Sequence, residues 1–292
     1  MTTMRTSPHD AVRDASRHLG LPPGPVTPLR SHATHVYLLP DQQTVARVRP
    51  LTDAPASART TTLLHWLHAH GFPATQPLAD PVEDPASGYI VTFWTHYPQP
   101  PIPPPAAALG TLLNALHALP HPPVTLPQYE PLAHLRDSLD RTTTLTTRQR
   151  TWLTTAVDEA VHAYRALDSP LGHGLIHGDA YPGNTLWDGD LVRLGDWDEA
   201  ATGPRELDLA NTLQGAVRFG RTEREINEFL DAYGHDPRPW PGLRVLTRMR
   251  DLHTLGSFIR RADRGDDRAT HELTHRLHTL QTGHHNARWG IH

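Results

Sequence analysis

The sequence contains no cysteine and no lysine, so all 27 of its Lys/Arg-type basic residues are arginines. Without cysteine the chain can form neither disulfide bonds nor thiolate metal sites, and it has no cysteine nucleophile. Histidine and oxygen-bearing side chains remain as the available metal ligands. Where another protein uses a lysine as a fixed positive charge, this chain must use an arginine.

Long hydrophobic runs are also missing. No stretch approaches the roughly twenty apolar residues of a membrane span, and the first residues have no apolar core of a signal peptide. The net charge is −4, and no block of arginines alternates with aromatic residues. We therefore expect a soluble cytoplasmic protein with neither nucleic acid nor a membrane as partner. Its 292 residues suffice for one large domain or two lobes, and the oligomeric state is unknown.

The chain does contain a motif at residues 177–184. His177 and Asp179 are followed by Asn184, and the Pro-Gly pair before Asn184 favours a loop. In phosphoryl transfer a carboxylate must stand beside the attacking hydroxyl and an amide oxygen beside a metal ion on the phosphates, and H-x-D-x-x-x-x-N supplies both types. A loop histidine of this kind more often braces the backbone than carries protons, so we expect bracing from His177.

A second pattern follows directly. Residues 185–194 read as two short strands around an Asp-Gly turn, which is typical of a β-hairpin. A hairpin brings its open ends together, and these ends carry Asn184 and Asp196. Their oxygens suit Mg²⁺, which takes few protein ligands alongside phosphate oxygens. The sequence thus predicts a magnesium site there, with Asp198 as a second ligand or a structural partner.

Residues 175–208 resemble the catalytic and metal-binding loops of the aminoglycoside phosphotransferase and choline kinase family, relatives of the protein kinases. The match is carried by His177-Gly-Asp179, Asn184 and Asp196-Trp-Asp198. The resemblance implies a two-lobed α+β fold of the protein-kinase type, with a small N-terminal β-sheet lobe that has one main helix and a larger, mostly helical C-terminal lobe. It also implies a Mg²⁺-dependent enzyme that moves the γ-phosphoryl of ATP or GTP to a small-molecule hydroxyl. Asp179 would be the catalytic base or orienting carboxylate, and Asn184 and Asp196 the metal ligands.

The first 96 residues fit the nucleotide-covering lobe of that fold. Strands are predicted within residues 26–50 and at 89–94, and a helix at 56–70. A cation on the third strand of the resembled fold contacts the phosphates, and Arg47 stands at that place. The loop before it, residues 30–35, lacks the glycines of a phosphate loop, which leaves Ser31 and Thr34 as candidate contacts.

One partner expected from the resemblance is absent. The helix at 56–70 should carry a glutamate that pairs with the strand cation, near Thr60, but the first glutamate of the chain is Glu83. Arg47 therefore either pairs elsewhere, with Asp53 or Asp196 as candidates, or contacts phosphate unpaired.

A proline-rich run that ends at residue 105 predicts a boundary between lobes at 1–96 and 97–292. In the resembled fold the nucleotide base bonds to such a hinge, which makes Thr95 and His96 candidates, although a surface linker would be equally rich in proline. Helices are predicted at 106–119 and 146–167, and further helices within 206–234 and within 241–282. The helix at 146–167 begins with a capping box.

The acceptor would dock against this helical part, with Asp198, Glu199 and Asp208 as candidate contacts. Polycationic aminoglycosides need paired carboxylates, but the last 52 residues hold nine arginines against five acids. This tally weighs against a strongly cationic acceptor. Two kinds of acceptor stay open: an antibiotic, which would make this a resistance or self-protection enzyme, or a metabolite such as a sugar or amino alcohol.

Two functions from other classes stay open. The missing helix glutamate and glycine loop would also fit a nucleotide-binding regulatory module with weak or no catalysis, although the intact Asp179, Asn184 and Asp196 argue against it. A metal-dependent hydrolase would turn over without any nucleotide, and no paired histidine ligands accompany Asp179 to support it.

Overall fold

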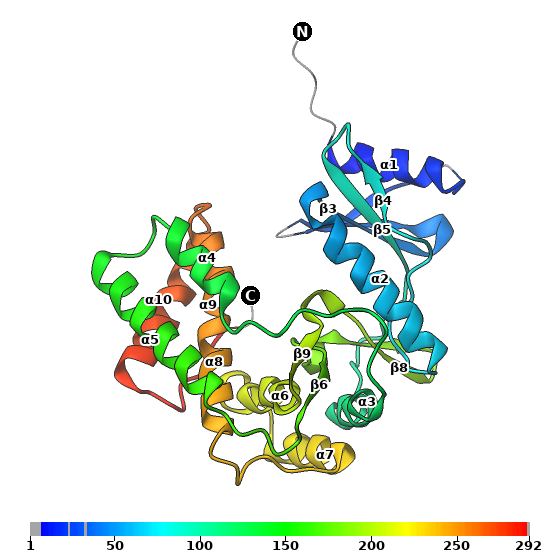
Figure 1. The fold of residues 1–292 in the computed structure, drawn as a ribbon. Coiled ribbons are helices and arrows are strands. Elements are labelled where there is room, and N and C mark those ends of the chain that lie inside the picture. Colours follow the sequence, from blue (N-terminus) through cyan, green and yellow to red (C-terminus); the bar gives the residue numbers. More distant parts are fainter. Residues whose placement is uncertain (1–6, 23, 32–33, 291–292) are drawn as a thin grey trace. The chain divides into compact units, whose positions relative to one another are not determined.

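The computed structural model describes residues 7–22, 24–31 and 34–290, and the chain divides into two compact units (Figure 1). The first unit comprises Met1–Pro104, Leu119–Leu126 and Gly183–Ala200, and the second comprises Pro105–Ala118, Pro127–Pro182 and Ala201–His292. The hairpin predicted at 185–194 groups with the first unit, and the lobe boundary at residues 96 and 97 stays a prediction. No described helix is both long and apolar enough to cross a membrane.

The first unit is built on a five-stranded antiparallel sheet in the order β1-β2-β3-β5-β4. Its strands are β1 (Thr27–Ser31), β2 (His35–Leu39), β3 (Thr44–Pro50), β4 (Val82–Asp84) and β5 (Tyr89–Thr95). The strands predicted within 26–50 and at 89–94 are confirmed. The strand β4 was not predicted, because three residues are too few to establish an alternating pattern.

Helix α1 (Pro8–His18) packs on one face of this sheet. It begins with a capping box between Ser7 and Asp10, and it buries Val12 and Ala15 against strand residues that include Ala46 and Val48. Because successive side chains of a strand point to opposite faces, Arg47 lies on the face away from α1.

The main helix of this unit, α2 (Ala54–Ala69), begins two residues before the predicted start at residue 56 and buries Leu63, Leu64 and Leu67. The segment that follows α2 is hydrogen-bonded to a hairpin formed by β7 (Thr185–Asp188) and β8 (Leu191–Leu194). Leu194 donates its N–H to the carbonyl of Pro73 and accepts from the N–H of Thr75, each at 2.9 Å. The predicted hairpin is confirmed, and these two bonds attach it to the first unit.

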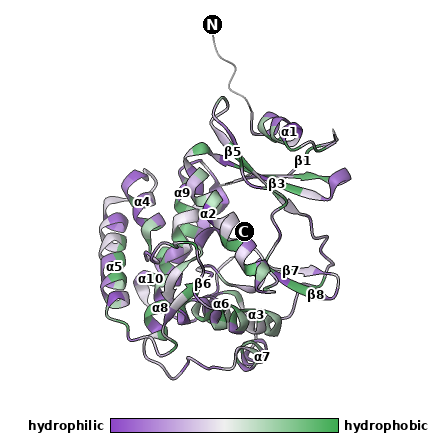
Figure 2. Ribbon diagram, turned by 45° about the vertical axis from the view of Figure 1, so that its right-hand side comes forward, coloured by the Kyte–Doolittle hydropathy of each residue, from purple (hydrophilic) through white to green (hydrophobic). Residues whose placement is uncertain are grey.

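The second unit is mainly helical. It contains α3 (Ala106–Ala118), α4 (Ala133–Arg141), α5 (Thr147–Arg165), α6 (Glu206–Phe219), α7 (Glu223–Tyr233), α8 (Leu243–His253), α9 (Leu255–Ala262) and α10 (Asp267–Thr282). Hydrophilic and hydrophobic residues mix along α5 and α8 (Figure 2), and the apolar side of α5 buries Leu153 and Val157. The predicted capping box of Thr146 and Gln149 is present. The helix that it begins ends at Arg165, two residues before the predicted end at residue 167.

Two short strands frame the loop that carries Asp179. β6 (His173–Ile176) pairs antiparallel with β9 (Ala201–Pro204), and Ile176 lies opposite Ala201. Each strand has only four residues, so the sequence pattern predicted neither of them. The pair fixes the chain immediately before His177.

Gly110 of α3 lies in close contact with α7. A Cβ atom there would lie 2.2 Å from the carbonyl oxygen of Phe229 and 3.1 Å from the Cβ of Ala232. We expect Gly110→Ala to reduce the free energy of unfolding by about 1–3 kcal/mol, because the helices must move apart to accept the methyl group. Thermal denaturation would show this as a lower Tm.

Gly256→Ala is the matched control, because Gly256 also lies in a helix and its nearest neighbour, at 3.4 Å, is the mobile end of Arg260. Alanine is the better helix former, so this variant should keep or raise the Tm. Equal Tm changes in the two variants would contradict the close packing at Gly110.

Candidate active site

The hairpin brings the two predicted metal ligands to its open end. The N–H of Gly195 donates to the carbonyl oxygen of Asn184 at 2.8 Å, so Asp196 directly follows the residue that closes the hairpin onto Asn184. Asn184 is buried, whereas 40% of the Asp196 side chain is exposed. Asp196 has the left-handed backbone angles φ 60° and ψ 60°, which cost energy for any residue with a Cβ and are often found at functional sites.

Trp197 anchors the loop that follows. Its ring is buried, its Nε1–H donates to the carbonyl oxygen of Leu194 at 2.8 Å, and it packs edge-on against Phe72 with ring centroids 5.7 Å apart. Trp197 begins a single 3₁₀ turn that ends at Glu199, which is partly buried. The turn thus places Asp198 and Glu199 directly after the anchored tryptophan.

Arg47 pairs with Asp196 and Asp198, whereas α2 contains no glutamate for it. Its Nη2 lies 2.7 Å from an oxygen of Asp198 and 3.3 Å from an oxygen of Asp196, and 16% of its side chain is exposed. Burial acts to lower the pKa of Arg47, but the two carboxylates together outweigh burial and raise that pKa above its ordinary value. Of the alternatives predicted for Arg47, pairing with Asp196 is confirmed.

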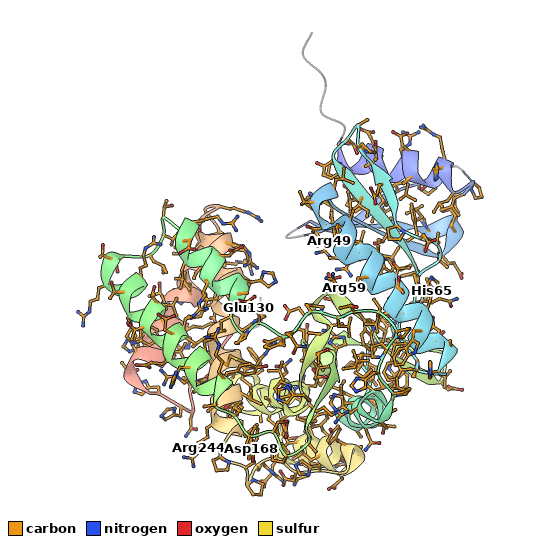
Figure 3. All side chains as sticks on the ribbon, in the orientation of Figure 1. Arg49, Arg59, His65, Glu130, Asp168 and Arg244 are labelled. Carbon is orange, nitrogen blue, oxygen red and sulfur yellow. The ribbon has the colours of Figure 1, made fainter. Side chains whose placement is uncertain are left out.

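Asp53 and Asp198 both form ion pairs with a second arginine. Arg49, labelled in Figure 3, follows Arg47 by two residues on β3 and therefore shares its face. It contacts Asp53 at 2.9 Å and Asp198 at 3.1 Å. The two arginines thus hold Asp198 from the sheet side, which is the structural role predicted as one of its alternatives. Its use by an acceptor stays a prediction.

The predicted nucleotide contacts lie at two places in the first unit. Thr95 ends β5 and donates its N–H to the carbonyl of Gln76, and the N–H of His96 donates to the carbonyl of Gln43. Thr34 lies in a bend just before β2, and the side chain of Ser31, the last residue of β1, is outside the described part of the chain. Because the N–H groups of Thr95 and His96 are already used, a nucleotide base would need other donors nearby.

In the second unit, His177 and Asp208 brace the loop that carries Asp179. His177 is fully buried, and its Nδ1 accepts from the N–H of Asp179 at 3.3 Å. Asp208 accepts from the N–H of His177 at 2.8 Å and from that of Gly178 at 2.9 Å. Gly178 has a φ of 83°, a conformation that favours glycine. The predicted bracing role of His177 is thus confirmed.

Asp208 is itself fully buried on α6. Its Oδ2 also lies 3.1 Å from Nε2 of His117, whose Nδ1 bonds the hydroxyl of Tyr233 at 2.9 Å. Burial acts to raise the pKa of Asp208, but the hydrogen bond and charge of His117, together with the nearby His177, bring that pKa below its ordinary value. Both carboxylate oxygens bond the chain, which suits bracing, and the predicted contact with an acceptor stays a prediction.

The Asp179 carboxylate itself pairs with an arginine that the sequence did not single out as a partner. Nη2 of Arg250, on α8, lies 2.5 Å from Oδ1 of Asp179, with 8% of the arginine side chain and 27% of the aspartate side chain exposed. The two residues are 71 positions apart, and no motif joins them. The only sequence signal was the excess of arginine in this part of the chain.

The same region of α8 holds a partly buried histidine. The pKa of His253 lies well below its ordinary value of 6.5, first because of burial and then because Arg250, His134 and Arg260 are positively charged. The unfolded chain therefore takes up a proton at His253 as the pH falls through about 6.5, whereas the folded chain does not. Stability from this group is lost below that pH.

We expect the Tm to fall between pH 7.5 and pH 5.5, and to fall less in His253→Gln, because glutamine cannot take up the proton. Differential scanning calorimetry at the two pH values measures both differences. The exposed His271, replaced in His271→Gln, is the matched control and should keep the full pH difference. An undiminished pH difference in His253→Gln would contradict the assignment.

The chain matches one family of known proteins and the fold of several solved structures. A model of the phosphotransferase enzyme family matches residues 25–247. A search of curated protein sequences gave no match. Among solved structures, amicoumacin kinase hAmiN, in complex with AMP-PNP, Ca²⁺ and Ami, has 14% identity and a TM-score of 0.77, with 97% of this chain and 96% of that one covered.

Two further structures resemble the chain. A choline/ethanolamine kinase family protein from Mesorhizobium loti has 18% identity and a TM-score of 0.61, over 93% of this chain and 94% of that one. An aminoglycoside phosphotransferase from Streptomyces rimosus has 18% identity and a TM-score of 0.60, over 84% and 98%. At these identities the likeness concerns the fold, and it confirms the predicted kinase-like α+β class with a small antiparallel sheet and a larger helical part.

Proposed function

The chain belongs to the phosphotransferase enzyme family, and we propose that it uses Mg²⁺ to transfer the γ-phosphoryl group of ATP or GTP to a hydroxyl of a small molecule. The observation that carries the proposal is the closed hairpin, in which Gly195 bonds Asn184 and so sets an amide and the Asp196 carboxylate at one end. The similar amicoumacin kinase, solved with a nucleotide analogue and a divalent cation, supports the same chemistry. A cytoplasmic location, where both nucleotides occur, is part of the proposal.

Asn184 and Asp196 would hold the metal ion. They offer oxygen atoms only, as Mg²⁺ prefers, and among the described residues no group of three or more histidines and acids forms a fuller cage. A site with so few protein ligands suits an ion that takes its remaining ligands from phosphates and water. When bound, the ion would neutralise charge on the phosphates.

The side chains of Arg47 and Asp179 would contribute to the reaction by their position and charge. Arg47, held by Asp196 and Asp198, would contact the phosphates with its planar fork, at the place that a lysine takes in related folds. Asp179, on its braced loop, would accept the proton of the acceptor hydroxyl or orient that hydroxyl for attack. We further propose that residues 1–96 contribute nucleotide contacts and residues 97–292 acceptor contacts.

The charges of the second unit favour an acceptor that is not a polycation. Asp179 is paired with Arg250, and His253 stands near Arg250 and Arg260 in a basic region. The buried acids of this unit are engaged by the chain: Glu206 by the N–H of Leu171, Asp208 by His177, Asp251 by Arg218 and Glu272 by Arg276. An ammonium group needs a carboxylate partner. We therefore propose an uncharged or acidic acceptor, either an antibiotic or a metabolite.

A panel of acceptor compounds that differ in charge tests the proposal. The protein is incubated with Mg²⁺ and ATP or GTP, and with ethanolamine, glycerol, glycerate, an aminoglycoside and an uncharged nucleoside antibiotic. Mass spectrometry then detects an added phosphate. We expect a product from uncharged or acidic compounds, and little product in Asp179→Asn.

The other outcomes separate the alternatives. Product from the cationic compounds alone would keep the phosphotransferase and overturn the charge argument. Tight Mg-nucleotide binding without turnover would favour a regulatory module, and turnover without any nucleotide would favour a hydrolase.

A further inference from the structure

A second site of chemical interest lies inside the helical unit. A cavity of about 540 Å³ lies between α5, α6, α8 and the C-terminal end of α10. Its apolar wall consists of Trp152, Leu213, Val217, Leu252 and Leu280. A volume of this size falls within the range of about 300–1,000 Å³ that small-molecule sites occupy.

The cavity is separate from the surroundings of Asp179. Arg244, Arg248 and Asp251 line it from positions i, i+4 and i+7 of α8, which form one face of the helix. Arg250, which contacts Asp179, does not line the cavity, and at about 100° per residue it falls on another side of α8. One side of α8 thus lines the cavity, and another side contacts Asp179.

The buried polar groups of the cavity wall bond one another. Arg218 contacts both carboxylate oxygens of Asp251 and donates to the carbonyl oxygens of His284, His285 and Ala287. Asp251 also accepts from Gln214 at 2.8 Å. The negative charge of Asp251 is therefore balanced inside the wall and leaves nothing for a cationic ligand to pair with.

Positive charge remains at the exposed arginines of the wall. Arg244 and Arg248 are exposed and stand one turn apart, an arrangement that costs helix stability because like charges repel. Arg248 has a long contact of 3.4 Å with the exposed Glu159, and within the described ranges no ion pair is found for Arg244. Figure 3 shows Arg244 near the start of α8. Two weakly paired cations thus border a largely apolar cavity.

We propose that this cavity binds a small amphiphilic anion. The apolar body of the ligand lies against Trp152, Val217 and Leu280, and a carboxylate, sulfonate or phosphate group at its end meets Arg244 and Arg248. An arginine pair holds such oxyanions by charge-assisted hydrogen bonds. The site is independent of the proposed phosphoryl transfer, so its test does not need the acceptor.

Isothermal titration calorimetry with the full chain tests the proposal with three probes that share a chain length: decanoate, decanol and decylamine. We expect one decanoate to bind per chain, at least about tenfold more tightly than the neutral or cationic probe, because only the carboxylate can form charge-assisted hydrogen bonds with the arginines. Absence of saturable decanoate binding, or equal binding of all three probes, overturns the proposal.

Variants locate the bound probe. Arg244→Gln/Arg248→Gln removes two exposed charges, and Val217→Trp fills the cavity from a position that is 40% exposed, so neither disturbs the core. Each should weaken decanoate binding about tenfold or more. Arg141→Gln/Arg224→Gln, a matched loss of two exposed arginines elsewhere, and Asp179→Asn should both leave it unchanged. Unchanged affinity in the cavity variants, or a loss in Asp179→Asn, overturns the assignment.

Discussion

Asp179→Asn is expected to lower kcat for phosphoryl transfer by about 10²–10⁴-fold, because an amide cannot accept the proton of the acceptor hydroxyl. The loop itself should keep its shape, since its bracing bonds run from His177 and Gly178 to Asp208 and do not involve the Asp179 carboxylate. Binding of Mg-nucleotide should therefore change little. Steady-state kinetics with the acceptor from the panel, beside nucleotide titrations, measure both quantities.

The control for this variant is Asp190→Asn, an isosteric change at an exposed turn position of the β7–β8 hairpin. It should leave kcat and nucleotide affinity unchanged. Because Asp179→Asn also takes the carboxylate partner from the buried Arg250, the Tm of both variants is measured. A correctly folded Asp179→Asn protein with undiminished kcat would remove Asp179 from the chemistry.

The second large effect is expected at Asp196. Asparagine tolerates the left-handed backbone of this position, so Asp196→Asn keeps the loop conformation and removes only the charge. Loss of the carboxylate should weaken metal binding and cost about 10³-fold in kcat, since a metal ion supplies several kcal/mol of charge stabilisation in such reactions. Turnover as a function of Mg²⁺ concentration measures the change.

The Mg²⁺ series also distinguishes metal binding from support of Arg47. If Asp196 holds the ion, a higher Mg²⁺ concentration should restore part of the lost rate. Arg47 keeps its shorter contact, at 2.7 Å, to Asp198 in this variant. A normal rate with an unchanged Mg²⁺ dependence would show that Asp196 is not a metal ligand.

Local features of the fold could be predicted from the sequence because short-range rules decide them. The capping box at Thr146 and the Asp-Gly turn of the hairpin each depend on residues within four positions of one another. The hairpin in turn determined that Asn184 and Asp196 would lie near each other. Strands such as β4 and β6 escape such rules because they are too short for a periodic pattern and no Asp-Gly turn joins them to a partner strand.

Long-range partners could not be predicted in the same way. The sequence offered Asp53 and Asp196 for Arg47, and the structure added Asp198, which lies in the 3₁₀ turn that begins at Trp197. The bonds from His177 and Gly178 to Asp208 join residues about thirty positions apart. Such pairs depend on tertiary packing, and an unaligned sequence carries no signal for them.

The lack of lysine has a physical counterpart in the structure. Arginines occupy the buried and partly buried cation positions, and each has a planar fork that can bond two partners at once. Arg47 and Arg49 both reach Asp198, and Arg218 bonds Asp251 together with backbone carbonyls. We expect lysine to be a poor substitute at these positions, because an ammonium group is a point charge without a fork.

Following the γ-phosphoryl group itself tests the proposed reaction most directly. ATP or GTP with ¹⁸O at the three non-bridging γ positions is incubated with Mg²⁺, the acceptor and either the natural protein or Asp179→Asn. Direct transfer predicts a phosphate ester that carries all three heavy oxygens and takes its fourth oxygen from the acceptor hydroxyl, with little product from the variant. Label found only in inorganic phosphate, or equal product from the variant, would contradict an Asp179-dependent phosphotransferase.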